Sequence, residues 1–347
     1  MKTVRARTRS LWTVAVILGI AVLWGSAARA EPLLVKMATL APEGSAWHLI
    51  LKEMGEKWKA ASGGRVTLRL YPGGVAGDDD DVVRKIRLGT LNGASLGSSG
   101  LADIDRSVLA LQVAMMYQSF PEFDYVLEQM SPRIEKAFLA KGYVLLHWAD
   151  AGWVHFFTKT PVRTPDDLRP LKLFVWSGTD ETAEIWKASG FNPVPLPSTE
   201  ISTALQTGLV GALPTTPQAA VLLQWYTYAK NMTDVRWGVL LGGTVISKAT
   251  WDRIPADVRP ALLEAAREAG RKIRQEIRAS IPRDVEAMRK RGLNVVHVDA
   301  AAEVLWVKAA EAAYPLVRGS YAPADAFDEA LRLRNDYRKR QAAAGQR

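Results

Sequence analysis

The chain has 347 residues, of which 48% are hydrophobic and 23% are charged, and this length can bury the cores of two lobes. Its formal charge is +9, but residues 1–30 hold five basic and no acidic side chains, so that +4 remains for the rest. This small and dispersed excess predicts no nucleic-acid partner, and the absence of cysteine excludes disulfides, thiolate metal sites and a cysteine nucleophile.

The N-terminus has the pattern of a cleaved signal peptide. Four basic residues between Lys2 and Arg9 precede an uncharged apolar run from Leu11 to Trp24, and Ala28-Arg29-Ala30 supplies small residues for cleavage before Glu31. The alternative is an uncleaved anchor, for which the run is short, because a bilayer span needs about 20 apolar residues. We therefore expect residues 1–30 to be removed and a soluble mature protein to begin at Glu31.

The first part of the chain alternates strand and helix patterns, which is typical of α/β lobes. Residues 33–39 read as a strand, and apolar residues then recur at helical spacing from Trp47 to Trp58. A second strand at 66–70 precedes a helix that starts near Asp79. The acidic run Asp78–Asp81 suggests either helix capping or calcium. Capping is favoured because acids at a helix start complement its dipole, and the later glutamate of a calcium loop is missing.

The second part begins near two predicted strands, 143–148 and 153–157. Thr164–Asp167 marks a helix start, followed by a strand ending at Trp176 and a helix from Thr179 to Ser189. The chain returns to the first lobe near Gly242, and a long helical pattern follows Pro255, which Pro282 should kink or interrupt. Two amphipathic helices, 300–314 and 325–341, complete the chain.

Several phrases in order carry a resemblance to a known family. They are GGRVTLRLYPGG at 63–74, IRLGTL at 86–91, TPDDLRPLKL at 164–173, GFNPVP at 190–195, TALQTG at 203–208 and SKATWDRI at 247–254. Across about residues 33–290 the sequence closely resembles the solute-binding proteins of tripartite ATP-independent periplasmic (TRAP) transporters, of the DctP type.

The resemblance implies a two-lobed periplasmic solute-binding protein, α/β in class, with a long helix crossing both lobes. We expect lobe I to contain residues 31–155 and about 242–282, and lobe II residues 156–241 and about 283–347. The implied partners are a small-molecule ligand in the cleft and two TRAP membrane subunits driven by an ion gradient. No cofactor and no ATP site are expected.

The resemblance also points to the ligand site, where this chain departs from the family. The family's K-I-R-V strand carries an arginine that pairs with a substrate carboxylate, and this chain has Phe174 there. A second family arginine corresponds to Trp153, and the family's D-G-Q-E-N-P turn becomes a turn that contains Thr215 and Thr216. Because strand side chains alternate, Phe174 and Trp176 share one face.

We therefore predict an uncharged or largely apolar ligand, such as an aromatic, lipid-like or terpenoid molecule. The predicted ligand-binding residues are Trp47, Ser99, Trp153, Phe174, Trp176, Thr215, Thr216 and Trp237. The aromatic residues among them are alternatively core residues. The ligand is alternatively an organic acid held by hydroxyls and backbone amides. From other classes, the chain is a carrier for an envelope export complex or a ligand module of a sensor.

Catalysis finds little support in the sequence. Gly97–Gly100 is one residue too short for the nucleophile elbow of hydrolases, and no histidine pair has the spacing of a helical zinc site. A triad of His147, Asp150 and Ser99 can be drawn, but these residue types occur in most chains of this length. We expect no catalytic residue and no metal ligand.

Overall fold

The computed structural model describes residues 31–176 and 180–345, so the predicted signal peptide lies outside the described residues. Within them, nine strands form one sheet in the order β2-β1-β3-β8-β4-β7-β5-β6, with β9 paired to β8. The strands are β1 Leu33–Thr39, β2 Val66–Tyr71, β3 Gly93–Gly97, β4 Tyr143–Thr158, β5 Lys172–Trp176, β6 Asn192–Leu196, β7 Ala212–Thr215, β8 Asn231–Ser247 and β9 Asn294–Val296.

The helices flank this sheet. They are α2 Ala46–Ala61, α3 Asp79–Arg87, α4 Ser98–Ile104, α5 Phe120–Ala140, α6 Pro165–Leu168, α7 Asp180–Ala188, α8 Ile201–Thr207, α9 Pro217–Leu222, α10 Lys248–Arg253, α11 Arg259–Arg289, α12 Ala300–Leu316 and α13 Ala324–Gly345. Short helical turns are η1 Arg106–Gln112, η2 Ser198–Glu200, η3 Trp225–Thr227 and η4 Val317–Tyr321.

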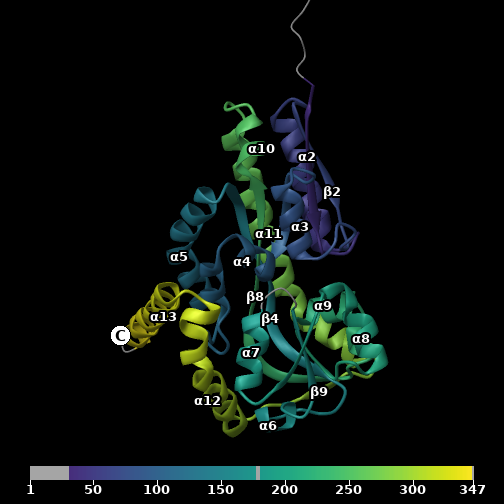
Figure 1. Ribbon diagram of the computed structural model, residues 1–347, viewed down its shortest axis with the longest axis vertical. Coiled ribbons are helices and arrows are strands. Elements are labelled where there is room, and N and C mark those ends of the chain that lie inside the picture. Colours follow the sequence, from purple (N-terminus) through teal and green to yellow (C-terminus); the bar gives the residue numbers. More distant parts are fainter. Residues whose placement is uncertain (1–30, 177–179, 346–347) are drawn as a thin grey trace, which may run out of the picture.

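Two long antiparallel strands connect the two halves of the sheet. β8 pairs with β3 near its C-terminal end and with β4 along much of its length. β4 pairs in turn with β7, which leads to the parallel strands β5 and β6. The strands predicted at 143–148 and 153–157 are thus one strand, and the β4–β8 register shifts at three places along it. Such bulges bend and twist a strand pair. Figure 1 shows α2 and α3 beside one half of the sheet, and α7, α8 and α9 beside the other half.

Helix α11 runs along both lobes, as predicted. Leu262 and Ile273 are buried in a core cluster with Trp58 of α2, whose indole Nε1 donates to the Leu262 carbonyl at 2.9 Å. Near the other end of α11, Met288 belongs to the core cluster of the second lobe. Pro282 lies inside this helix and does not interrupt it. A proline removes one helical hydrogen bond, and burial of both ends against the lobes keeps the helix continuous.

An ion-pair network fixes α11 at the junction of the lobes. The Arg278 guanidinium donates to both carboxylate oxygens of Asp124 on α5 at 2.7 Å, and to Oδ2 of Asp150 on β4 at 2.7 Å. It also lies 4.1 Å from the centre of the Phe120 ring. Asp150 is fully buried, so its charge depends on Arg278 for compensation.

The end of the chain differs from the predicted lobe assignment. Helix α13 packs against α5, and its residues Phe327 and Leu333 share a core cluster with Phe123 and Met130. Residues 324–345 therefore join the first lobe, whereas we placed them with the second, because the apolar face of α13 is complementary to that of α5. The remaining lobe boundaries stay a proposal.

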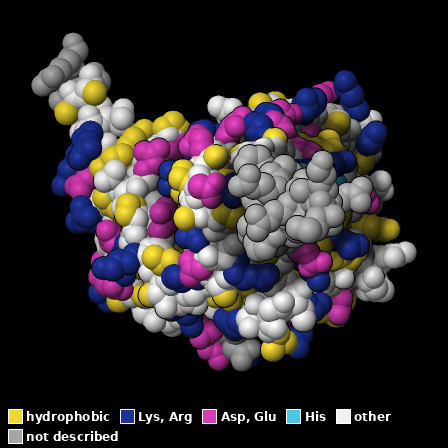
Figure 2. Space-filling model, turned by 90° about the horizontal axis from the view of Figure 1, so that it is seen from above, with side chains coloured by type: hydrophobic (Ala, Val, Ile, Leu, Met, Phe, Trp, Pro, Cys, Tyr) yellow, Lys and Arg dark blue, Asp and Glu magenta, His cyan; other side chains and the backbone are white. Residues whose placement is uncertain are grey.

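On the face that Figure 2 shows, basic and acidic side chains are interspersed.

Candidate functional site

A cavity of about 420 Å³ lies between the lobes. From the first lobe it is lined by residues 39–42, Ser45, Trp47, Gly73, Gly74, Asp79 and 95–99. The second lobe contributes Trp176, Ser198, Thr199, Ser202, Thr215, 218–219, 222–223 and Trp225, and the connecting strands contribute Ala151 and 240–242. Strands β1, β3, β5 and β7 end at this cavity, which is where open α/β sheets bind ligands.

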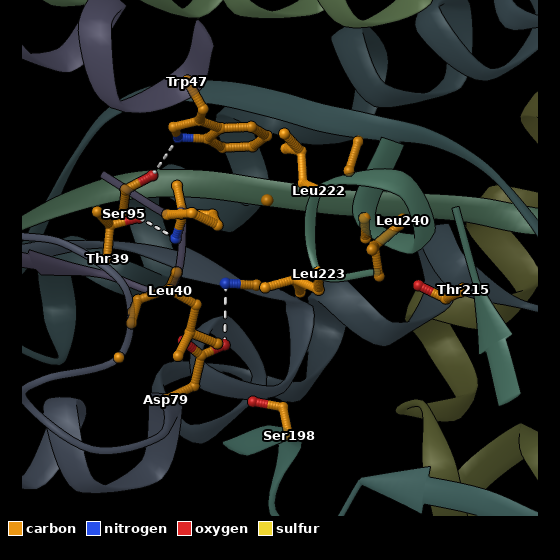
Figure 3. Close-up of a pocket in the computed structure, with 18 of the residues that line it drawn as sticks. Thr39, Leu40, Trp47, Asp79, Ser95, Ser198, Thr215, Leu222, Leu223 and Leu240 are labelled. Carbon is orange, nitrogen blue, oxygen red and sulfur yellow. Dashed lines mark hydrogen bonds between the residues drawn. The ribbon is translucent and has the colours of Figure 1, made fainter. Parts of the chain in front are cut away.

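Large apolar side chains form most of the wall. Leu40 and Trp47 of the first lobe and Leu222 and Leu223 of the second lie around the cavity, with Leu240 of β8 between the lobes (Figure 3). Leu222 and Leu223 follow each other at the end of the short helix α9, and both are exposed. Exposed leucines that line a concave surface favour an apolar ligand.

Two of the three tryptophans that line the cavity use their polar atoms away from the ligand space. Trp47 Nε1 donates to Ser95 Oγ at 3.0 Å, and Trp225 Nε1 donates to Ser202 Oγ at 3.0 Å. Gly242 makes room for the Trp47 ring, since a Cβ there would lie 3.3 Å from Cη2 of the indole. Because both N–H groups are occupied, the indoles present mainly carbon to the cavity.

The charge of the lining is unusual for an organic-acid site. Among the described residues that line the cavity there is no Lys, Arg or His, and Asp79 is the one ionisable group. Its Oδ2 accepts from the Gly97 amide at 2.9 Å and from Ser99 Oγ at 3.1 Å. Burial raises the pKa of the Asp79 carboxyl to about 7, and the neighbouring Asp78 carboxylate adds to the rise.

Four of the eight predicted ligand-binding residues line the cavity. These are Trp47, Ser99, Trp176 and Thr215. Trp176 ends β5, so its ring reaches the cavity from the second lobe, while Thr215 ends β7. The hydroxyl of Ser99 donates to Asp79, so it already has a partner inside the protein.

The other four predicted residues do not line the cavity. Phe174 is 0% exposed and lies behind Trp176, with 5.0 Å between the ring centres. Trp153 packs against Phe120 at 5.1 Å. Thr216 caps α9 by accepting from the Ala219 amide at 3.3 Å. Trp237 stacks on Trp186 at 5.4 Å and lines a separate cavity of about 110 Å³.

Sequence reasoning missed the apolar contribution of helix α9 and the position of Asp79. Asp78 does cap α3, as predicted, since its carboxylate accepts from the Asp79 amide at 2.9 Å. The next carboxyl, Asp79, is turned inward to the cavity. The sequence could have indicated the role of α9. The pair Leu222-Leu223 ends a short apolar helix, and this helix directly follows the strand that carries Thr215.

The residues of the imagined triad have separate partners. Ser99 donates to Asp79, Asp150 accepts from Arg278, and His147 packs against α11, where a Cβ on Gly270 would lie 2.7 Å from His147 Nδ1. Burial lowers the pKa of His147 to about 4.

In residues 31–176 and 180–345, no group of three or more acidic or histidine side chains is arranged to hold a metal ion. Nor does any helix in those ranges have the length and apolar character to span a membrane.

Comparisons with known proteins agree with this architecture. The family model for bacterial extracellular solute-binding proteins, family 7 (DctP), matches residues 37–318. A solute-binding protein of Roseobacter denitrificans is 26% identical over 295 residues, which cover 83% of this chain and 89% of that protein. The sialic acid-binding periplasmic protein SiaP of Vibrio cholerae is 24% identical, with 76% of this chain and 83% of that protein covered.

The solved structures show the same fold. A TRAP periplasmic solute-binding protein of Xanthobacter autotrophicus with bound beta-D-galacturonate superposes with a TM-score of 0.80 at 20% identity. The superposition covers 87% of this chain and 99% of that chain.

Proposed function

The chain belongs to family 7 of the bacterial extracellular solute-binding proteins, the DctP family of TRAP receptors, and from this premise we propose that its cavity binds an uncharged, largely apolar small molecule. The observation that carries the proposal is the lining of the cavity, whose surface is mostly apolar and includes six leucines and three tryptophans, while the described residues provide no cation.

The similar proteins make the contrast clear. The Xanthobacter protein holds galacturonate, a carboxylate, and the Vibrio protein is named for sialic acid. A carboxylate in the present cavity would lack charge-assisted hydrogen bonds worth about 1.5–3 kcal/mol each, and it would face Asp79. Burial of apolar ligand surface contributes roughly 25 cal/mol per Å² instead.

The proposed location is the periplasm, where the protein would deliver its ligand to TRAP membrane subunits. The named periplasmic relatives and the signal-peptide pattern before Glu31 support this. The carrier for an envelope export complex is the alternative, and neighbouring genes distinguish the two: genes for two TRAP membrane subunits favour uptake, and an efflux operon favours the carrier.

A carboxylate held by hydroxyls is the second candidate, because Thr39, Ser98 and Thr215 line the cavity and relatives bind carboxylates. Titration distinguishes it from the apolar ligand. The neutral fluorophore N-phenyl-1-naphthylamine should bind the mature protein, while succinate and D-galacturonate should show no heat of binding. At 100 times its Kd, a ligand of the native state stabilises it by about 2.7 kcal/mol.

A charge placed on the wall sharpens the test. Leu223→Arg alters a lining residue that is 39% exposed, so the guanidinium stays hydrated and folding is preserved. We expect it to weaken fluorophore binding by at least tenfold. The control is Leu316→Arg on α12, where the leucine is 43% exposed and does not line the cavity. Micromolar binding of succinate by the wild type would refute the apolar ligand and favour the second candidate.

A further inference from the structure

The two lobes are joined by hydrogen bonds at the edge of the cavity. Ser198, at the start of η2 in the second lobe, donates its amide N–H to Oδ2 of Asp78 at 2.7 Å and its hydroxyl to Oδ1 at 2.9 Å. Asp78 belongs to the first lobe, 120 residues earlier in the chain. Figure 3 shows Ser198 beside Asp79, the residue that follows Asp78.

The backbone around this contact allows a close approach. Gly74 has φ +75°, and a Cβ there would lie 3.4 Å from Leu40 Cδ2 and 3.6 Å from Thr199 Cγ2. Gly74, Ser198 and Thr199 all line the cavity. Residues 198–199 therefore form a part of the cavity wall that rests directly on the first lobe.

We propose that Asp78 and Ser198 are positioning residues that form a latch, holding the lobes closed over the bound ligand. The proposal rests on the cleft closure that the proposed function requires and is independent of the class of ligand. Neither residue needs to touch the ligand. Their bonds determine how long the closed state lasts.

Local structure explains why this pair is suited to the role. Capping of α3 uses Oδ1 of Asp78, which accepts from the Asp79 amide at 2.9 Å, and this leaves Oδ2 available. The Ser198 N–H begins a short helical turn and has no partner within that turn. Both groups reach a protein partner only when the lobes meet, and bonds to a carboxylate are among the stronger hydrogen bonds.

A second polar contact between the lobes has a different character. Arg106 of η1 and Glu181 of α7 form an ion pair at 3.0 Å, with each side chain 40% exposed. Exposed pairs contribute little to stability. We therefore expect the Asp78–Ser198 contact to have the larger influence on closure.

Two variants of Ser198 separate the contributions of its two hydrogen bonds to Asp78. Ser198→Ala removes the hydroxyl and keeps the N–H. Ser198→Pro removes both donors, and it suits this position because Pro197 has φ −62° and ψ 147°, the conformation favoured before proline. Glu200→Ala, an exposed position in the same turn, is the matched control.

Lobe separation can be measured without any ligand. The chain has no cysteine, so spin labels can be attached at Lys52→Cys on α2 and Gln206→Cys on α8, both of which are exposed. Pulsed electron–electron double resonance measures the distance between the two labels. It should find the distance of the closed state populated in the wild type and in Glu200→Ala. Its population should fall in Ser198→Ala and fall further in Ser198→Pro.

Kinetics with N-phenyl-1-naphthylamine provides the second readout. Ser198→Pro should raise the dissociation rate about tenfold, which corresponds to about 1.4 kcal/mol, while the association rate changes little. Identical distance distributions in the wild type and Ser198→Pro would overturn the latch, whether both are open or both closed. Absence of fluorophore binding together with the expected distance shift would contradict the proposed ligand class alone.

Discussion

Substitution of Phe174 tests whether this side chain belongs to the core or to the ligand site. The structure buries its ring completely, between the second-lobe core and Trp176. Truncation of a buried phenylalanine costs about 3–5 kcal/mol of unfolding free energy. Phe174→Arg should cost at least as much, because its guanidinium would be buried without a carboxylate partner.

The assay is thermal unfolding followed by far-ultraviolet circular dichroism, which measures Tm. Since 1 kcal/mol shifts Tm by roughly 2–4 °C in domains of 150–250 residues, Tm should fall by about 10 °C in Phe174→Ala. The control is Trp176→Ala at the half-buried lining position next to it, which should lose less stability and more fluorophore affinity. A Phe174→Arg variant with wild-type stability that binds succinate would refute the assignment of Phe174 to the core.

Two further predictions concern buried charges. Because burial raises the pKa of Asp79 from 3.8 to about 7, the native state holds its proton more tightly, so this stabilising contribution is full below pH 4 and is lost as pH rises through 7. One pKa unit corresponds to about 1.4 kcal/mol. The free energy of unfolding of the wild type, measured in urea relative to Asp79→Asn, should therefore decline by up to about 4 kcal/mol between pH 4 and pH 8. Equal pH profiles of the two proteins would contradict the burial of this carboxyl. Arg278→Gln should lose about 3–5 kcal/mol, because the Asp150 charge stays buried without its cation, whereas Arg271→Gln on the exposed face of the same helix should lose less than about 1 kcal/mol; similar losses would show that the junction network is not important.

The fold could be predicted from the sequence because its signals are periodic and local. The strand at 33–39, the capped start of α3 and the apolar stripe of α11 each follow from spacing and capping chemistry that need no tertiary information. The packing of α13 could not be predicted in this way, since an amphipathic helix shows which face is apolar and not which partner covers it.

The ligand site was predicted in part, and strand β5 shows why. Phe174 and Trp176 do lie on the same side of the strand, as alternation requires, and their rings are in contact. What alternation cannot indicate is where the core ends. Phe174 lies in the middle of β5 and is covered, whereas Trp176 is its last residue and reaches the cavity. The aromatic side chain that β5 contributes to the cavity is therefore Trp176, two positions after Phe174.

The proposed latch does not require an apolar ligand, but it contributes more to the closed geometry when the ligand is apolar. A carboxylate held by an arginine makes directional bonds, so a charged ligand can itself fix the relative position of two lobes. Apolar contact is non-directional, and a ligand held by Trp47 and Leu223 can slide without losing buried area. The bonds that fix the closed geometry must then come from the protein, and the Asp78–Ser198 pair provides them at the edge of the cavity. Loss of the Asp78–Ser198 bonds should accordingly leave a neutral apolar ligand with no directional bonds that fix the closed geometry.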